Sequence, residues 1–305
     1  MSREHPVNVG ASVRQRLLNL AKTERRPFIE VLQYFAMERF LFRLGCTQYV
    51  DRLTLKGAAL LRVWGISLPR ATRDIDFLGR LDGSPQQLLE VVREILAVPV
   101  EDGIVFDLDS LEAKVITEDA AYEGVRATVR GSLAGALFKL QLDVGIGDVM
   151  VPEPCWVEYP QLLDLGGPRV QAYQPETSIA EKFQAMVELD LTNSRMKDFY
   201  DIWLLRRSLE IDAEKLAAAI RATFRHRRTP IPTTPPTALT DRFALDEVKR
   251  LQWRAFLRKL AADDLHLHEV IEDIRPLLMD AAAAAAAAAA GDDDDHVVVE
   301  EDDEE

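Results

Sequence analysis

The feature that most restricts the fold of this chain is a change of hydrophobic period in its middle. Between residues 103 and 149, apolar residues alternate with polar ones in the segments IVFDLDS, EAKVITED, GVRATVRGSL and LFKLQLDVGIGDVM. Alternation predicts strands, because successive strand side chains point to opposite faces of a sheet. On both sides of this run, apolar residues recur at three- and four-residue steps, which indicates helices. The predicted fold class is therefore α+β: a small mixed β-sheet core flanked by helices, with a largely helical C-terminal half.

Helical and strand patterns outside this run define the remaining elements. Residues 11–44 predict two helices, the second beginning near Pro27 and ending at Gly45, and residues 84–98 predict another that begins with Ser-Pro. Short strands are expected at RLTL and DIDFLG, with a helix that opens at Gly57 between them. After a Pro- and Gly-rich crossing at 152–169, the expected helices are ETSIAEKFQAMVEL, RMKDFYDIWLLRRSL, DAEKLAAAIRATFRHRR and two more near 245–262 and 266–279, with a proline-rich loop at 229–240.

These patterns divide the 305 residues into four parts. Residues 1–50 are N-terminal helices that pack on a core at 51–150, and residues 151–280 form a mainly helical C-terminal domain. Residues 281–305 are a run of alanines followed by an acidic tail. We expect this part to be disordered or appended, because alanines offer no distinct face to bury and like charges repel. The alternative is a tail whose carboxylates imitate phosphate in a basic groove.

The charge is uneven along the chain. The formal net charge is −14, but ten acidic residues and neither Lys nor Arg follow position 291, so the rest of the chain carries only −4. This balance neither requires nor excludes a nucleic-acid partner. The basic segment RATFRHRR at 221–228 is a candidate contact for an RNA backbone, although a solvated basic helix face is the more common meaning of such a run.

The sequence predicts a cytoplasmic protein without a membrane partner. Its first residues, MSREHPVNVG, lack the pattern of a signal peptide, and no apolar run is long enough to span a bilayer. The two cysteines, Cys46 and Cys155, lack the spacing of a metal site, and so few cysteines are typical of a reducing compartment.

Two carboxylates in an otherwise apolar strand, Asp74 and Asp76 of DIDFL, form the first candidate site. They share one face of the strand, while Ile75 and Phe77 occupy the other. Neighbouring carboxylates repel each other, and a divalent cation removes that conflict. Oxygen-only ligands suit Mg²⁺, which also binds substrate phosphates. An isolated pair of aspartates like this is more often a solvated strand end than a metal site. The surrounding motifs decide between these two interpretations.

Other residues favour a phosphate and magnesium site. In FKLQLDVGIGD, Asp143 alternates away from the apolar face and is the candidate that activates an attacking hydroxyl. Asp148 follows the glycines and is a second choice. Gly57, between a strand and a helix, lets backbone N–H groups approach a phosphate, and the helix N-terminus adds favourable potential. Lys56 would supply a positive charge beside it.

The order of these motifs resembles the signature of the DNA polymerase β-type nucleotidyltransferases. More narrowly, LKGAALLRVWGISLPRATRDIDFL, ETSIAEKFQAM and RMKDFYDIW are similar to the AbiEii-like nucleotidyltransferases, the toxins of type IV toxin–antitoxin and abortive-infection systems. The matching segments lie between about 53 and 205. Ala58 departs from the Gly-Gly or Gly-Ser pair of that family. Alanine keeps its backbone N–H, so phosphate binding is expected to survive.

This resemblance implies roles that the local patterns leave open. Lys182 would contact the nucleotide triphosphate as a point charge, and Asp198 would orient that lysine or engage the acceptor. On spacing alone, the helix that carries Asp198 would be a salt-bridged surface helix. The remaining motif residues, without an assigned role, are Arg195, Lys197 and Asp201. The expected nucleotide-binding residues besides Lys182 are Lys56, Gly57, Ala58, Thr72 and Arg73, with Arg70 as a further phosphate contact or ion-pair partner.

The implied activity is Mg²⁺-dependent transfer of a nucleoside monophosphate from an NTP. Asp74, Asp76 and Asp143 would hold the metal ions. The resemblance further implies a growth-inhibiting toxin, with the tRNA 3′ end as acceptor and a cognate antitoxin as partner. One alternative is the same chemistry on a protein hydroxyl or on a small molecule such as an aminoglycoside. The other is a non-catalytic nucleotide- or RNA-binding protein that retains the fold.

Overall fold

The computed structural model of the protein describes residues 8–66, 72–118, 122–260 and 264–294. The chain forms two compact units. Unit 1 comprises residues 1–148 and 154–173, and unit 2 comprises residues 149–153 and 174–305. Within the described residues, no helix combines the length and the hydrophobicity that a bilayer crossing requires.

Unit 1 begins with two helices, α1 (Val9–Glu24) and α2 (Phe28–Gly45). The Asn8 side chain caps α1 by accepting a hydrogen bond from the Ala11 N–H, and Arg25 ends this helix in the left-handed conformation. α2 follows Pro27 and buries residues on nearly all its sides, as expected for a helix whose apolar residues are not confined to one stripe. The predicted pair of helices is confirmed.

A mixed sheet forms the centre of unit 1. Its described strands are β1 (Leu53–Lys56), β2 (Asp74–Gly79), β3 (Ile104–Glu118), β4 (Tyr122–Leu133), β5 (Ala136–Ile146), β6 (Cys155–Glu158) and β7 (Arg169–Ala172), in the order β3-β4-β5-β2-β1-β7-β6. β2 is parallel to β5 and β1 is parallel to β7, whereas the other neighbours are antiparallel. Shorter elements connect them: η1 (Gln48–Asp51), η2 (Gly57–Ala59), α3 (Leu60–Val63) and α4 (Pro85–Leu96).

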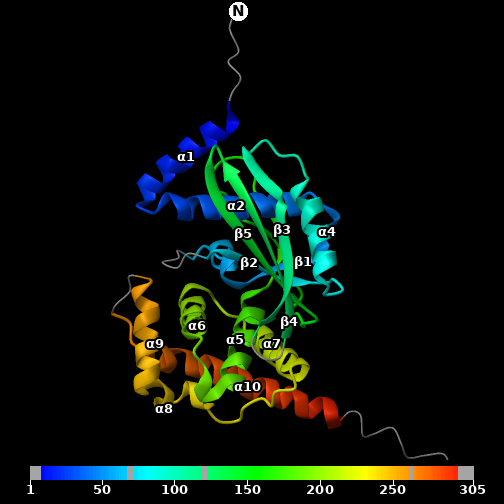
Figure 1. The fold of residues 1–305 in the computed structure, drawn as a ribbon. Helices are drawn as coiled ribbons and strands as arrows, with labels where there is room; N and C mark the ends of the chain where they lie inside the picture. Colours follow the sequence, from blue (N-terminus) through cyan, green and yellow to red (C-terminus); the bar gives the residue numbers. More distant parts are fainter. Residues whose placement is uncertain (1–7, 67–71, 119–121, 261–263, 295–305) are drawn as a thin grey trace, which may run out of the picture. The chain divides into compact units, whose positions relative to one another are not determined.

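The two faces of this sheet differ in chemistry. Phe77, Leu142 and Val144 lie on one face and are at most 2% exposed. That face packs against α2 and α4, which contact each other and the strands (Figure 1). The opposite face carries the acidic residues of DIDFL and FKLQLD. The alternation in the sequence therefore separates a core face from a polar face, as the predicted α+β fold requires.

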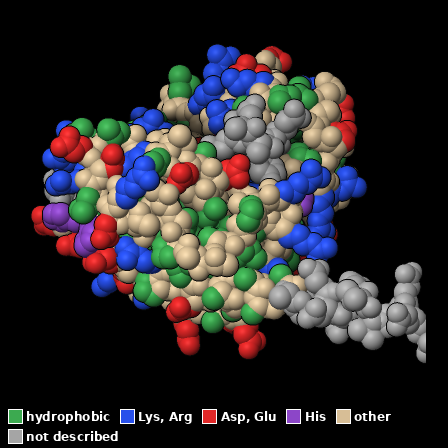
Figure 2. Space-filling model, turned by 90° about the horizontal axis from the view of Figure 1, so that it is seen from below, with side chains coloured by type: hydrophobic (Ala, Val, Ile, Leu, Met, Phe, Trp, Pro, Cys, Tyr) green, Lys and Arg blue, Asp and Glu red, His purple; other side chains and the backbone are tan. Residues whose placement is uncertain are grey.

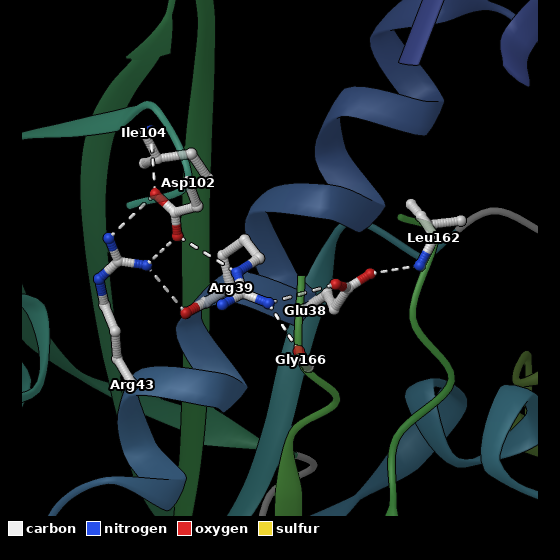
Figure 3. Close-up of polar contacts among 7 residues, drawn as sticks. All are labelled: Glu38, Arg39, Arg43, Asp102, Ile104, Leu162 and Gly166. Atoms are coloured by element: carbon white, nitrogen blue, oxygen red, sulfur yellow. Dashed lines mark hydrogen bonds and ion pairs between the residues drawn. The ribbon is translucent and has the colours of Figure 1, made fainter. Parts of the chain in front are cut away.

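A buried ion network anchors α2 in unit 1 (Figure 3). Asp102 accepts hydrogen bonds from Arg39 Nε at 3.2 Å and from Arg43 Nη1 at 2.6 Å, and all these side chains are at most 4% exposed. Asp102 also accepts the N–H of Ile104, the first residue of β3, at 3.0 Å. Charges at this depth are stable only when they are paired and hydrogen-bonded. The network therefore fixes α2 to the start of β3.

Glu38, one helix position before Arg39, extends the network to the segment between β6 and β7. Its Oε2 accepts the Leu162 N–H at 2.7 Å, while Arg39 Nη1 donates to the Gly166 carbonyl at 2.8 Å (Figure 3). Burial raises the pKa of the Glu38 carboxyl to about 7, although the Leu162 N–H and the Arg39 charge lower it. This buried carboxyl therefore titrates near neutral pH.

The described elements of unit 2 are helices. They are α5 (Pro175–Leu189), η4 (Asp190–Thr192), α6 (Met196–Ser208), α7 (Ala213–His226), η5 (Thr237–Leu239), α8 (Asp241–Ala244), α9 (Glu247–Arg258) and α10 (Leu267–Asp294). The longer helices each bury part of their surface. α7, for example, buries Leu216, Ala219 and Ile220 at helical spacing and packs against α5 and α10.

α10 is longer than the sequence predicts. It continues through the alanine run, where disorder or an appended segment is expected, and reaches Asp294. Ala281, Ala282 and Ala285 are at most 5% exposed and follow buried Leu278 at helical spacing. Alanine therefore does form a buried face here, because its small side chain allows close approach to neighbouring helices. Residues 295–305, which hold the rest of the acidic tail, lie outside the described residues.

Other departures from the predicted elements are local. The first two alternating segments join into the single strand β3, with a shift of register between Asp107 and Glu112. β6 and β7 lie in or beside the Pro- and Gly-rich crossing, and α8 follows the proline-rich loop; the sequence analysis predicts none of them. Each has four residues, too few to establish a hydrophobic period.

Candidate active site

Three carboxylates meet on the polar face of the sheet, where β2 lies beside β5. One side-chain oxygen of each of Asp74, Asp76 and Asp143 lies within 4.8 Å of the others. The parallel register pairs Asp76 directly with Asp143. Asp143 is 4% exposed, and the two residues of β2 are half-buried. The structure thus brings together the residues for which the sequence predicts metal binding; we call them the carboxylate triad.

Basic residues flank the triad in one row of the sheet. Lys56 of β1 lies opposite Asp76, and Arg126 of β4 lies opposite Asp143, so the row reads Lys56, Asp76, Asp143, Arg126 across adjacent strands. Side chains of directly paired residues lie on the same face of a sheet. Arg126 donates two hydrogen bonds to Asp143, Nε–Oδ1 and Nη2–Oδ2, each of 2.7 Å. Gln141 adds a third, from Nε2 to Oδ2, at 3.2 Å.

Asp74 is oriented from the residues that precede β2. Thr72 Oγ1 donates to Asp74 Oδ1 at 2.8 Å, and the Thr72 N–H donates to Tyr34 Oη at 3.1 Å. The carbonyl of exposed Arg73 accepts a hydrogen bond from Gln33 Nε2 at 3.0 Å. Two successive side chains of α2 therefore fix the entry to β2. Thr72, which the sequence suggests as a nucleotide contact, is engaged with Asp74.

Gly57 fills a role that the sequence does not suggest. Its φ is +73°, which favours glycine, and a Cβ at this position would overlap Asp76 Oδ2. The Asp76 carboxylate therefore lies against the Gly57 backbone. Lys56 is half-buried, with its Nζ 5.8 Å from the centre of the Tyr173 ring. The expected helix is reduced to η2, which holds buried Ala58, and the single turn α3, so the helix dipole adds little here.

The donor set of the triad fits a hard divalent cation. It consists of carboxylate oxygens, the ligands that Mg²⁺ and Mn²⁺ prefer. Three carboxylates this close repel each other, and the single guanidinium on Asp143 offsets only part of their charge. A divalent cation bound there would neutralise phosphate oxygens.

Unit 2 holds a second cluster, in which a lysine lies between two aspartates. Lys182 Nζ of α5 donates to Asp198 Oδ1 at 2.7 Å and to Asp201 Oδ2 at 2.9 Å, both on α6. Arg195 Nε donates to the other oxygen of Asp198. The aspartate side chains are at most 5% exposed, whereas that of Lys182 is 18% exposed. We call these four residues the lysine cluster; its two positive and two negative charges balance.

This pairing fixes the charge states of the lysine cluster. Burial favours a neutral Asp198, but Lys182, Arg195 and Lys197 outweigh burial and lower the pKa of Asp198 to about 2. Burial likewise opposes a charged Lys182, and Asp198 and Asp201 raise the pKa of this lysine above its ordinary 10.5. Lys197 itself is exposed at the start of α6. Lys182 and Asp198 therefore stay ionised throughout the neutral range.

The segment before α6 is fixed from α9. Asn193 is fully buried, and its Oδ1 accepts the Arg195 N–H at 2.8 Å. Lys249 Nζ donates to the Asn193 carbonyl, also at 2.8 Å. These bonds hold the backbone at Arg195, whose side chain then reaches Asp198 one helical turn later.

Comparison with known families identifies the family of the chain. A family model described as the nucleotidyl transferase AbiEii toxin of type IV toxin–antitoxin systems matches residues 39–289. The chain belongs to this family. It is therefore a nucleotidyltransferase, as the sequence motifs predict, and its fold is the α+β fold expected from them.

Two solved structures from Helicobacter pylori are similar to this AbiEii-family chain. JHP933 is 18% identical, with a TM-score of 0.45; the match covers 93% of this chain and 98% of JHP933. A protein described as a candidate nucleotidyltransferase is 17% identical, with a TM-score of 0.40; the match covers 88% of this chain and 95% of that protein. Among curated proteins, none matched the chain.

The structure sorts the predicted AbiEii motif residues into the two clusters. Asp143, not the second choice Asp148, joins the triad, and Asp148 lies beyond the end of β5. Asp201 bonds Lys182 on the neighbouring helix. Arg70 lies outside the described residues.

Three residues that support the triad are not predicted from the sequence: Arg126, Gln141 and Tyr34. Arg126 belongs to GVRATVRG, whose alternation places it on the polar face of its strand. That signal is visible in the sequence, but the register that sets Arg126 opposite Asp143 is not. Tyr34 lies in a helix whose residues are mostly apolar, and nothing in the sequence indicates a partner for its hydroxyl.

The basic segment 221–228 divides between interior and surface. Arg227 has a side chain only 11% exposed and donates to Gln184 of α5 at 2.8 Å, so it supports the fold of unit 2. Arg225 and Arg228 are exposed. Figure 2 shows Lys and Arg side chains gathered at the right-hand edge of a face that also carries hydrophobic and acidic side chains. Only part of the segment is thus available to an acidic ligand.

Proposed function

We propose that the protein transfers a nucleoside monophosphate from an NTP to an acceptor hydroxyl, with Mg²⁺ at Asp74, Asp76 and Asp143. The observation that carries this proposal is the carboxylate triad, whose ligand oxygens lie within 4.8 Å of one another. A divalent cation bound there neutralises phosphate oxygens and positions them for in-line displacement. Family membership supports nucleotidyl transfer as the reaction.

In this reaction the acceptor oxygen forms a bond to the α-phosphorus, and the bond from that phosphorus to the pyrophosphate oxygen breaks. The acceptor hydroxyl loses its proton to solvent, and Asp143, which would hold a metal ion, is the carboxylate that we assign to assist that loss. Lys56 and the backbone at Gly57 and Ala58 lie beside Asp76 and are the candidate contacts for the triphosphate. Thr72 orients Asp74 for the same chemistry.

We assign Lys182 to the triphosphate as a further positive charge. Asp198 and Asp201 hold its ammonium group in place, while 18% of the side chain stays exposed for a ligand. A lysine held in this way is oriented before the nucleotide binds, which lowers the cost of ordering it. Arg195 would maintain the arrangement by holding Asp198.

For the acceptor we propose the 3′ end of tRNA, and for the biological role a cytoplasmic growth-inhibiting toxin with a cognate antitoxin. The family description, a toxin of type IV toxin–antitoxin systems, supports the role. The exposed Arg225 and Arg228 are candidate contacts for an RNA backbone.

Label transfer tests this proposal. The full-length protein is incubated with Mg²⁺, each labelled NTP in turn and total RNA, and products are separated by size. Label on tRNA with the wild type, and none with Asp76→Asn or with chelator, is the expected result. The matched control is Asp107→Asn, an exposed carboxylate of the same sheet that pairs with Arg130.

Different outcomes separate the parts of the proposal. Label on protein, or on an added aminoglycoside, instead of RNA would contradict the tRNA acceptor and leave the transfer chemistry in place. No label on RNA, protein or aminoglycoside with any NTP would contradict the proposed activity. Expression that arrests growth with wild type but not with Asp76→Asn would support the toxin role; equal toxicity would contradict it.

A further inference from the structure

Asp143 has a cationic partner, Arg126, on the neighbouring strand β4. Arg126 donates to both of its oxygens at 2.7 Å, in the bidentate geometry that makes Arg–carboxylate pairs strong. The side chain of Asp143 is 5% exposed and that of Arg126 is 32% exposed, so Arg126 is the more solvent-exposed member of the pair. By contrast, Asp74 is held by a neutral hydroxyl, that of Thr72.

These bonds leave a defined part of Asp143 for a further ligand. An ionised carboxylate offers about two acceptor positions on each oxygen. Among the described residues, Oδ2 accepts from Arg126 Nη2 and Gln141 Nε2, whereas Oδ1 accepts from Arg126 Nε alone. Oδ1 is therefore the oxygen with a position left, and only one.

The charges around Asp143 also limit the binding of a further cation. The row Lys56, Asp76, Asp143, Arg126 carries two negative and two positive side chains, and Arg126 is bonded to Asp143 at the distances given above. A fixed cation at this range disfavours a second cation at the same carboxylate. Arg126 thus has two opposing effects. It orients Asp143 for binding, and it weakens the attraction of Asp143 for a metal ion.

We propose that Arg126 is a positioning residue that holds Asp143 with Oδ1 directed to the triad and keeps the affinity of the nucleotide-free site for divalent cations low. In consequence, the site takes up its full complement of metal together with the phosphates of the nucleotide, whose negative charge outweighs the guanidinium. This inference rests on the proposed metal-dependent transfer, but its first measurement requires no nucleotide.

Mn²⁺ alone is the probe. Binding to the full-length protein is measured without nucleotide, from the electron paramagnetic resonance signal of free Mn²⁺, and binding that persists in Asp76→Asn is subtracted to remove the contribution of the acidic tail. We expect Arg126→Gln to bind Mn²⁺ about tenfold more tightly than the wild type, because one positive charge leaves the site. The matched control is Arg130→Gln, the next arginine on the same face of β4, which pairs with Asp107 and is 70% exposed; it should bind as the wild type does.

Transfer kinetics supply the second measurement. Arg126→Gln should lower kcat about a hundredfold, since a misplaced catalytic group costs about that much, while KM for the NTP changes little. Arg126→Lys retains the charge without the planar fork. It should therefore bind Mn²⁺ like the wild type and still lose kcat, which a merely structural role would not produce. This variant also covers the case in which Arg126→Gln fails to fold.

The outcomes are distinct. Unchanged or weaker Mn²⁺ binding by Arg126→Gln, or no triad-dependent binding by any variant, would overturn the proposal. Tighter Mn²⁺ binding combined with no nucleotide transfer by the wild type would retain the charge-offset role and contradict the proposed function instead. A wild-type kcat in Arg126→Gln would overturn the positioning role.

Discussion

In unit 1, three carboxylates lie together, two of them in a row with Lys56 and Arg126; in unit 2, two carboxylates bond a lysine, and one of the two also bonds an arginine. Both groups are largely buried and both use Asp oxygens within hydrogen-bond distance of a cation. The carboxylate triad has excess negative charge and gains from a further cation, whereas the lysine cluster is balanced and loses if any member is removed. The same residue type thus belongs to a proposed metal site in one unit and to a charge-balanced ion group in the other.

The largest expected effect is on activity, at the triad. Asp76→Asn should lower nucleotide transfer by about a thousandfold or more, because the metal loses a ligand. Its thermal unfolding temperature should change little, since the substitution relieves repulsion among the three carboxylates while it removes a negative charge opposite Lys56. Label transfer and calorimetry on the same preparation check both. A clear fall in the unfolding temperature would show that the triad, like the lysine cluster, stabilises the fold.

The lysine cluster should behave in the opposite way. Asp198→Ala should reduce the free energy of unfolding by about 3–5 kcal/mol, because Lys182 and Arg195 are left without their buried partner. Guanidinium denaturation measures the change. The matched control is Asp273→Ala, whose 3.6 Å and 3.5 Å pairs with Arg206 and Arg207 are partly exposed and should contribute less than about 1 kcal/mol. Equal losses in the two variants would contradict the assignment.

Glu38, a buried carboxyl outside both groups, shows whether burial or ion pairing sets the pKa of a buried acid. Burial dominates at Glu38 and raises its pKa from 4.5 to about 7, whereas its bonded partners lower the pKa of Asp198. The folded state therefore binds the Glu38 proton more tightly than the unfolded state does. The stabilisation is complete below pH 4.5 and is lost as pH rises through about 7, with a total of about 3 kcal/mol.

Glu38→Gln tests this assignment, because the amide does not titrate. Between pH 4.5 and 8, the free energy of unfolding of the wild type should fall relative to that of the variant. Urea denaturation at several pH values measures the difference. A constant difference across this range would show that Glu38 stays ionised in the folded protein.

The smallest expected effect concerns the neutral support of Asp74. Tyr34→Phe removes the acceptor of the Thr72 N–H and should cost about 1 kcal/mol of stability, together with a several-fold loss of transfer through Asp74. Gln33→Ala, which removes the neighbouring bond to the Arg73 carbonyl at an exposed position, is the control and should change both quantities less. Similar effects from the two variants would show that α2 only supports the backbone.

Much of the fold follows from period and capping in the sequence. The alternating run gives the central strands, and Ser84 caps α4 as the Ser-Pro start predicts, with its hydroxyl accepting the Gln87 N–H. The four-residue elements β6, β7 and α8 carry too few residues for a period, and the burial of the alanine face in α10 depends on which helices lie beside it. Tertiary packing, not local preference, decides these parts.

The candidate site divides along the same line. Alternation alone places Asp74, Asp76 and Asp143 on polar strand faces, and the structure brings them together. The parallel pairing of β2 with β5, which makes Asp76 and Asp143 neighbours, involves residues far apart in the chain and has no local signature. The same holds for Arg126.

The contact between Gly57 and Asp76 couples the effects of substitutions at these two positions. Any side chain at 57 would collide with the Asp76 carboxylate, so Gly57→Ala should displace that carboxylate while every acidic residue is still present in the sequence. Asp76→Ala would remove the carboxylate with which a side chain at position 57 collides, so Gly57→Ala should then cost much less stability than it does in the wild type. The effects of the two substitutions should therefore be strongly non-additive. A relative that has lost its activity through a substitution at position 57 would still carry all three aspartates of the triad. Its loss of activity would be visible only at the residue that follows the lysine.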